Sequence, residues 1–396
     1  MQATRLRAWL VLGYCLLIQI LTVGIGTYSF AFFVLPWMQE FNAPRSELML
    51  AMSGFSLVVA ILSILCGPLI DRKSARVLVT IGILAFVGGL IGIALAPTAT
   101  IVIALFAVVM PVSLILSGPL MAQTLVARHF TEKRGMALGI CSLGTSFGGL
   151  IMAPLVTALL GDYDWRTVLL MLGGAGLVLM LPPAWLLLPS KAGSGGGHHG
   201  GNLLQLMRNP SVWLMALAYL GPASIFIALL HNIGAFAADL SVSQQQAGFV
   251  VSAASLMMIA AKFGVGALAD RVSHTLLYFV LLAMITLGIL LIVVGGNGWA
   301  LSIGVPIAAL SMGMMPLIAA MIARRFGPES FGSVMGVVLA IASLSGLAPA
   351  AAGLLREVSG SYGSAFTYLL ALLIPAALSF VALTQLPSAR PQPAAG

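Results

Sequence analysis

A single lysine, Lys262, interrupts a long apolar run, SLMMIAAKFGVGALADR, which extends from Ser255 to Arg271. If this run crosses a membrane as a helix, a charged lysine near its centre costs about 2.5 to 3.5 kcal/mol on insertion scales. All ten acidic residues of the chain fall in expected loops or at expected helix ends, so the sequence offers no carboxylate partner within a span. We therefore interpret Lys262 as a group that binds an anionic ligand in an aqueous cavity, with a structural lysine as the alternative.

Four other polar residues of the apolar runs are weaker candidates for ligand contact: Tyr28, Gln123, His231 and Asn232. Each can exchange hydrogen bonds with a carboxylate, but bonding between neighbouring helices explains each of them as well. The chain has no nucleophile elbow, phosphate-binding loop or metal-ligand spacing. We therefore expect neither an enzyme nor a bound cofactor or metal ion.

The cysteines and the paired histidines do not change that expectation. Cys15, Cys66 and Cys141 stand at unrelated positions without a C-x-x-C spacing, and we interpret them as apolar filling rather than a disulfide or metal ligands. His198 and His199 lie in a glycine tract, where two adjacent histidines cannot supply a preformed tetrahedral set. This tract is typical of a solvated linker.

Membrane-spanning helices must position these residues. Sixty per cent of the 396 residues are hydrophobic and only 7% are charged, which is typical of a polytopic membrane protein. A helix satisfies all its backbone hydrogen bonds internally, as hydrocarbon requires. The sequence thus predicts an all-α membrane protein with twelve transmembrane helices, at 9–36, 47–68, 77–96, 100–127, 134–160, 166–188, 211–237, 244–269, 274–295, 299–323, 330–355 and 362–386.

The distribution of basic residues predicts the orientation of these spans. With the N-terminus in the cytoplasm, fourteen of the eighteen lysines and arginines fall on the cytoplasmic side, three fall outside and one is Lys262. Such a bias places both termini of a multi-pass protein in the cytoplasm, here at the cell inner membrane. It also accounts for the net charge of +8, so we expect the lipid bilayer and no nucleic acid as a partner.

One structural unit is used twice in the chain. GPLIDR at 67–72 recurs as GALADR at 266–271, ARHF at 127–130 as ARRF at 323–326, and GDY at 161–163 as GSY at 360–362, with offsets of 199, 196 and 199 residues. The sequence therefore predicts two pseudo-symmetric six-helix bundles, at 1–188 and 211–396, joined by a cytoplasmic linker at 189–210. The offset of 199 pairs Lys262 with Ser63, so the lysine is not part of the repeated scaffold.

The loop GPLIDRKSAR, from Gly67 to Arg76, resembles the G-x-x-x-D-R-x-G-x-R/K signature of the major facilitator superfamily, with Ser74 in place of the usual glycine. A carboxylate at this position can face the positive N-terminal end of another helix. The resemblance implies a latch that holds the outward-open state, at Asp71, Arg72, Arg76, Asp270 and Arg271. For Arg76, simple anchoring by cytoplasmic positive charge is an equally good interpretation.

Two longer segments, NAPRSEL at 42–48 and RGMALGICSLGTSFGGLIMAPLVTALLGDYDWR at 134–166, resemble the monocarboxylate transporter and oxalate:formate antiporter branch of that family. This branch commonly carries a substrate-binding arginine in an R-x-x-x-G pattern, where this chain has Lys262 and Gly266. It also often carries a histidine seven residues before the aspartate of its seventh span, where this chain has Asn232 before Asp239, with His231 displaced by one position.

We therefore expect a secondary active transporter that moves a small organic anion, a mono- or dicarboxylate, by alternating access, and that works as a monomer. A lysine loses its proton more readily than an arginine when it is desolvated, so coupling to protons and exchange of two anions both stay open. The alternatives are an exporter of apolar or drug-like compounds and, from another class of protein, a membrane sensor or receptor built on a transporter scaffold.

Overall fold

A computed structural model describes residues 2–190 and 206–386 of the protein. The described residues form helices joined by short turns, and they contain no strand. His198, His199 and most of the expected linker lie outside these ranges. The two termini of the described chain are α1 and α18, and the helices between them follow the expected apolar runs.

Nine helical segments precede the gap at 191–205: α1 (Gln2–Val23), the π-helical η1 (Gly24–Tyr28), α2 (Phe30–Phe41), α3 (Arg45–Arg72), α4 (Ala75–Ala94), α5 (Ala99–Ser117), α6 (Pro119–His129), α7 (Arg134–Asp162) and α8 (Trp165–Leu187). The segments that follow it, from 210 on, are α10 (Pro210–Asp239), α11 (Gln244–Ala269), α12 (His274–Gly295), α13 (Gly298–Ala309), the 3-10 segment η2 (Leu310–Gly313), α14 (Met314–Phe326), α15 (Phe331–Ala342), η3 (Ser343–Leu347), α16 (Ala348–Ser359), α17 (Tyr362–Leu369), η4 (Leu370–Leu372) and α18 (Leu373–Gln385).

Twelve helical stretches in the described residues are long and apolar enough to cross a membrane, which confirms the expected number. The first stretch differs from the expected 9–36 because it covers Leu6–Tyr28. Its C-terminal end is the π-helical turn η1, where the Ser29 N–H and hydroxyl both donate to the Gly24 carbonyl, at 3.0 and 2.9 Å. Helix α2 then continues to Phe41, so a local change of helical pitch divides a run that looks continuous in the sequence.

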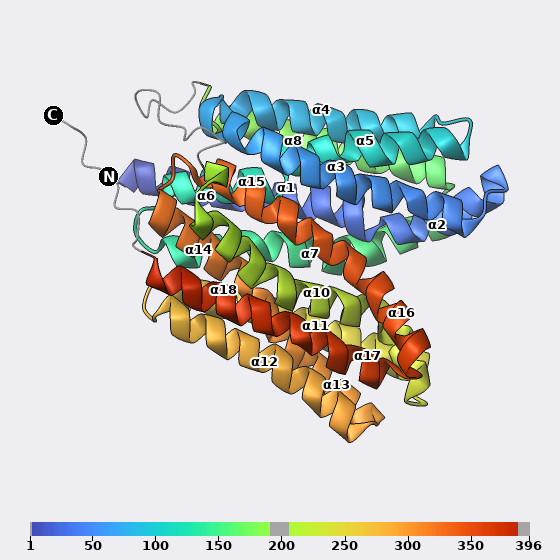
Figure 1. The fold of residues 1–396 in the computed structure, drawn as a ribbon. Coiled ribbons are helices and arrows are strands. Elements are labelled where there is room, and N and C mark those ends of the chain that lie inside the picture. The colour runs from blue at the N-terminus through green and yellow to red at the C-terminus, as the bar shows by residue number, and fades with distance from the viewer. Residues whose placement is uncertain (1, 191–205, 387–396) are drawn as a thin grey trace. The chain divides into compact units, whose positions relative to one another are not determined.

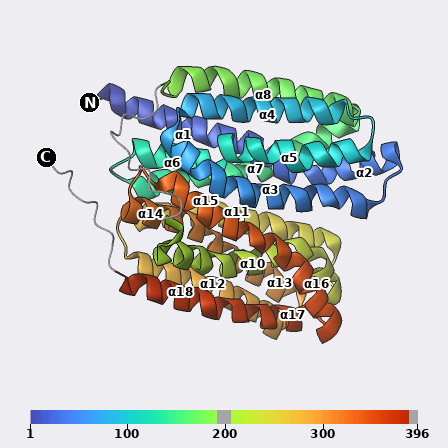
Figure 2. The same cartoon turned by 45° about the horizontal axis from the view of Figure 1, so that its top comes forward.

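The described helices belong to two compact units. One consists of Met1–Glu132, Cys141–Leu203 and Phe326–Ala340, and the other of Lys133–Ile140, Leu204–Arg325 and Ile341–Gly396. Figures 1 and 2 show α4 beside α5 and α8 in the first unit, and α12 beside α13 in the second. Each unit therefore includes the first residues of one helix, α15 or α7, whose remaining residues lie in the other. The expected boundaries at 188 and 211 stay a prediction.

Prolines interrupt the long helices at defined places. The three 3-10 segments η2, η3 and η4 each end two or three residues before a proline, at Pro316, Pro349 and Pro375. A proline lacks the N–H that would bond four residues back, and its ring crowds that carbonyl, so the preceding turn tightens. Each of these prolines therefore follows a locally tightened turn of its helix.

The proline of α10 leaves a carbonyl that another helix satisfies. Pro222 cannot donate to the carbonyl of Ala218, which stands four residues earlier. The hydroxyl of Tyr278 on α12 donates to this carbonyl at 3.0 Å. The Tyr278 ring is fully buried and stacks on Phe380 of α18, with 3.7 Å between the ring centroids. One side chain thus joins three helices of the second unit.

We expect Tyr278→Phe to lower the stability of the protein by about 1 to 3 kcal/mol, because the Ala218 carbonyl would lose its donor in a buried place. The unfolding temperature of the purified protein in detergent measures this effect. Tyr368→Phe is the matched control, since Tyr368 is 61% exposed, and it should leave that temperature unchanged.

Pro222→Ala tests the reason for the effect, because an alanine restores an N–H that can bond the Ala218 carbonyl. In that background Tyr278→Phe should cost less than in the native chain. An equal cost in both backgrounds would contradict the role assigned to the hydroxyl.

Candidate functional site

Lys262 lies well inside α11, seven residues before its end at Ala269, and only 7% of its surface is exposed. All ten acidic residues of the chain are described, and each lies near a helix end or in a turn between helices. A buried ammonium group this far from a helix end requires polar or anionic surroundings. The structure therefore agrees with the sequence in placing one basic group inside a membrane-spanning helix, and it places that group away from the exposed surface.

Close backbone contact fixes the turn of α11 that carries Lys262. A Cβ atom added to Gly139 of α7 would lie 2.7 Å from the Lys262 carbonyl oxygen and 2.7 Å from the Cα of Gly266. On another side, a Cβ added to Gly313 of η2 would lie 3.0 Å from the Ala261 carbonyl oxygen. Only glycine fits at these positions, so α7 and η2 hold the lysine's turn in place. Gly266, four residues after Lys262, thus has a packing role.

The same arrangement occurs around Ser63, the residue that the repeat pairs with Lys262. A Cβ added to Gly336 of α15 would collide with the Ser63 carbonyl oxygen and lie 3.4 Å from the Cα of Gly67. Ser63 is fully buried, and its hydroxyl has no hydrogen-bond partner among the described residues. The backbone geometry is therefore repeated, while the side chain at its centre is serine in one copy and lysine in the other.

The protein already uses the polar atoms of Asn232 and His231. The Asn232 amide nitrogen donates to the carbonyls of Ala228 and Pro349, at 3.0 and 3.1 Å, and its oxygen accepts from the Tyr362 hydroxyl at 3.2 Å. Asn232 thus links α10 to α16 and α17. The His231 ring is exposed, and its Nδ1 lies 2.8 Å from the Ile227 carbonyl of its own helix. These contacts give both side chains a structural role in the second unit.

Tyr28 and Gln123 belong to the first unit and differ in exposure. Tyr28 ends η1, is 39% exposed, and packs its ring over Gly149 of α7, where an added Cβ would lie 3.2 Å from the ring. Gln123 of α6 is 2% exposed, and its side-chain oxygen has no partner within the described part of the chain. A buried amide oxygen without a donor is costly, so Gln123 is the stronger candidate for contact with a polar ligand.

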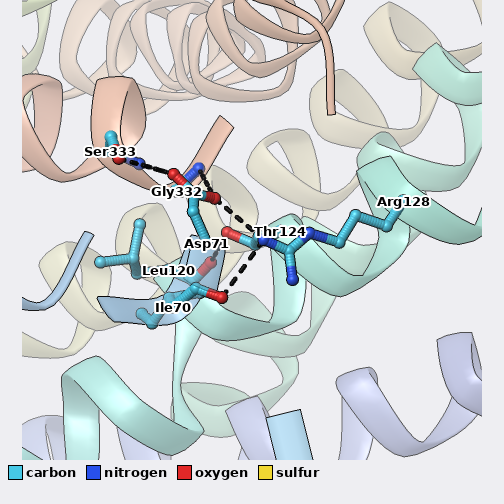
Figure 3. Close-up of polar contacts among 7 residues, drawn as sticks. All are labelled: Ile70, Asp71, Leu120, Thr124, Arg128, Gly332 and Ser333. Atoms are coloured by element: carbon cyan, nitrogen blue, oxygen red, sulfur yellow. Dashed lines mark hydrogen bonds and ion pairs between the residues drawn. The ribbon is translucent and has the colours of Figure 1, made fainter. Parts of the chain in front are cut away.

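Asp71 lies at the centre of a network that joins residues far apart in the sequence (Figure 3). Its carboxylate accepts from the N–H groups of Gly332 and Ser333, at 2.9 and 2.7 Å, and from the Ser333 hydroxyl at 2.6 Å. Arg128 of α6 adds an ion pair at 3.0 Å and also donates to the Ile70 carbonyl. The Asp71 side chain is only 1% exposed. It therefore caps the positive N-terminal end of α15.

Asp270 makes the equivalent contact in the second unit with fewer donors. It accepts from the N–H groups of Gly135 and Met136 at the start of α7, at 2.9 and 3.0 Å. Asp270 is exposed, and the residue equivalent to Ser333 is Met136, which has no hydroxyl. Both carboxylates that the repeat singled out thus cap a helix, and the cap at Asp71 is the more completely bonded one.

The arginines of the repeated loops differ in their surroundings. Arg76 donates to the Leu188 carbonyl from Nε and Nη2, at 3.0 and 2.8 Å, and lies over the Trp185 ring, so it binds the C-terminal end of α8. Arg72 and Arg271 are exposed. Sequence reasoning missed Arg128, although the repeated ARHF motif contains it, and it missed Ser333, which stands 262 residues from Asp71 without any local signal.

Comparison with known proteins agrees with this architecture. Residues 16–349, and in a second overlapping match residues 232–396, match the Major Facilitator Superfamily. Human monocarboxylate transporter 11 is 27% identical over 288 residues, which cover 67% of this chain and 60% of the relative, so the chain spans less than two thirds of that protein's length.

Two solved structures share the fold at low sequence identity. A variant of the Escherichia coli fucose:proton symporter FucP superposes with a TM-score of 0.73 at 15% identity, covering 97% of this chain and all of the other. The human organic anion transporter MFSD10 (TETRAN) superposes with a TM-score of 0.73 at 16% identity, covering 96% and 99%. The match along almost the whole sequence and the twelve apolar helices lead to one conclusion: the chain belongs to the Major Facilitator Superfamily and is a multi-pass membrane protein.

Proposed function

We propose that the protein carries a small organic anion, a mono- or dicarboxylate, across the cytoplasmic membrane, and that Lys262 binds the carboxylate. The observation that supports this most directly is the burial of Lys262 well inside α11. A carboxylate that contacts the ammonium group replaces part of the hydration that the buried charge has lost. The names of the relatives agree, since one is a monocarboxylate transporter and one an organic anion transporter.

The packing around Lys262 supports a role in binding rather than in holding the fold. The glycine contact between α7 and α11 involves the backbone of Lys262, not its side chain. The equivalent contact around Ser63 forms with a small side chain. This helix contact therefore does not require a long, charged side chain. Binding of an anionic cargo would require one. We propose Gln123, whose buried oxygen lacks a donor among the described residues, as a second group that contacts the cargo.

The energy source for transport depends on whether Lys262 stays protonated throughout the cycle. If Lys262 stays protonated throughout the cycle, one anion must replace another and the protein exchanges anions. If Lys262 releases its proton when the site is empty, a proton moves with each anion. The positive-inside bias of the sequence supports termini in the cytoplasm. A single chain contains all the residues that this proposal uses, which agrees with a transporter that works as a monomer.

We further propose that the helix caps at Asp71 and Asp270 latch one state of the transport cycle. A buried carboxylate at a helix N-terminus gains from the helix dipole and from charge-assisted hydrogen bonds. The Asp71 cap has three hydrogen bonds and an ion pair, whereas the Asp270 cap has two hydrogen bonds and is exposed. The Asp270 cap is thus the weaker of the two and the first to open.

Lys262→Ala should weaken carboxylate uptake into proteoliposomes by about 10- to 100-fold in apparent affinity, the worth of a hydrogen bond to a charged group. Lys262→Arg should restore part of it, because arginine keeps the charge with a different donor geometry. His231→Ala is the control, since this exposed ring bonds only its own helix among the contacts described above, and it should transport normally.

A panel of carboxylates under imposed pH gradients gives the measurement. Uptake that rises with an inward proton gradient indicates proton coupling, and uptake that requires an internal anion indicates exchange. Full uptake by Lys262→Ala would remove the lysine from the mechanism. Transport of apolar compounds without any carboxylate would favour the exporter.

The latch predicts a separate effect for each of two matched substitutions. Ser333→Ala removes the hydroxyl that donates to Asp71 and should lower the unfolding temperature, with a loss of about 1 to 3 kcal/mol. Met136→Ser adds a hydroxyl at the equivalent position beside Asp270 and should slow transport by strengthening the weaker cap. The unfolding temperature and the uptake rate measure the two effects, and Met136→Ser that transports faster than the native chain would contradict the latch.

A further inference from the structure

Helices α1 and α7 approach each other closely along a seam within the first unit. A Cβ atom added to Gly144 of α7 would lie 2.8 Å from the Cβ of Gln19 and 2.9 Å from the Leu16 carbonyl oxygen. Cys15 stands one turn before Gln19 on α1, and Cys141 stands one turn before Gly144 on α7. Both cysteines are therefore carried into the same part of the seam, and neither has any exposed surface.

The side-chain amide of Gln19 ties the two cysteines together. Its nitrogen donates to the Cys15 carbonyl at 3.1 Å, to the Cys141 carbonyl at 2.8 Å and to the Cys141 sulfur at 3.2 Å. The side chains of Cys15 and Cys141 also interact with each other. One nitrogen atom thus contacts both cysteine residues, and both lie in the same part of the seam.

The pair lies where α7 passes from one compact unit to the other. Residues Lys133–Ile140 of α7 belong to the second unit, and Cys141 is the first residue of the helix that belongs to the first. The start of α7 carries the N–H groups that Asp270 caps. A covalent bond at Cys141 would tie α7 to α1 at the point where the helix passes from one unit to the other.

We propose that Cys15 and Cys141 are a redox-active thiol pair, oxidised to a disulfide by a lipid-soluble organic hydroperoxide, and that this bond slows transport. The Cys141 thiol, whose sulfur accepts a hydrogen bond from Gln19, attacks the terminal oxygen of the hydroperoxide. The O–O bond breaks, the alcohol leaves with one proton, and a sulfenic acid forms on Cys141. The Cys15 thiol then attacks that sulfur, and water leaves as the disulfide forms.

The electrons and atoms of this reaction balance: two thiols and one hydroperoxide give one disulfide, one alcohol and one water. Both thiols are fully buried inside membrane-spanning helices, so the oxidant must be uncharged and must reach them through a local opening of the seam between α1 and α7. The third cysteine, Cys66 of α3, is half-buried and lies outside the pair. It serves as an internal control.

The experiment treats the full-length protein in liposomes with cumene hydroperoxide, unfolds it, and counts free thiols with a maleimide by intact mass. The native protein should lose two of its three thiols. Cys66→Ser should lose both of its thiols, whereas Cys15→Ser and Cys141→Ser should form no intramolecular disulfide. A non-reduced digest should contain the peptide that joins residues 15 and 141, and dithiothreitol should restore every thiol.

Gln19→Leu keeps the approximate size of the side chain and removes its N–H donor, so it should slow formation of the disulfide. It tests Gln19 as a positioning residue. Intact thiols in the native protein, or oxidation of single cysteines without the linking peptide, would overturn the proposal.

The effect on transport rests on the proposed function, so uptake of a carboxylate is measured separately. Oxidation should remove most of the uptake of the native protein and of Cys66→Ser, reversibly, and spare Cys15→Ser. A disulfide that forms without slowing uptake would overturn the regulatory part. Absence of carboxylate uptake before oxidation would count against the proposed cargo alone, since the thiol count stands without it.

Discussion

Hydrocarbon offers no partner to a polar group, and this constraint decides where the polar side chains of the described helices lie. Where Pro222 deprives the Ala218 carbonyl of its helical donor, the Tyr278 hydroxyl supplies one. Where α15 begins, Asp71 receives the N–H groups that the helix cannot use itself. The same constraint makes Lys262 informative, because a group whose burial is costly persists only where it meets a need.

The internal repeat preserves backbone contacts and varies the side chains placed on them. Asp71 and Asp270 each cap a helix through two consecutive N–H groups, and the Ser333 hydroxyl and an ion pair with Arg128 are added at Asp71. A duplicated scaffold therefore supplies the geometry, and a few substitutions give its two copies different hydrogen bonds.

Much of the fold could be predicted from the sequence, because length and apolar composition fix membrane spans and short repeated motifs fix their equivalence. The carboxylates of the caps could be found in the same way. Their partners could not, since nothing local marks Ser333 as a donor to a residue 262 positions away. Cys15 and Cys141 looked unrelated for the same reason, and only the packing of α1 against α7 brings them together. The π-helical turn at Gly24 could not be predicted either, because its hydrogen bonds depend on the local pitch of the helix.

The other copy of the repeat shows what the helix packing at Lys262 requires. The Ser63 carbonyl meets Gly336 as the Lys262 carbonyl meets Gly139, and Gly67 and Gly266 complete the two contacts. Packing between these helices therefore needs two glycines and a backbone carbonyl, and a serine side chain suffices at the centre. Lysine is longer, charged and costly to bury, and the glycine contact does not depend on its side chain. The proposed anionic cargo would give this side chain a use that the packing between these helices does not.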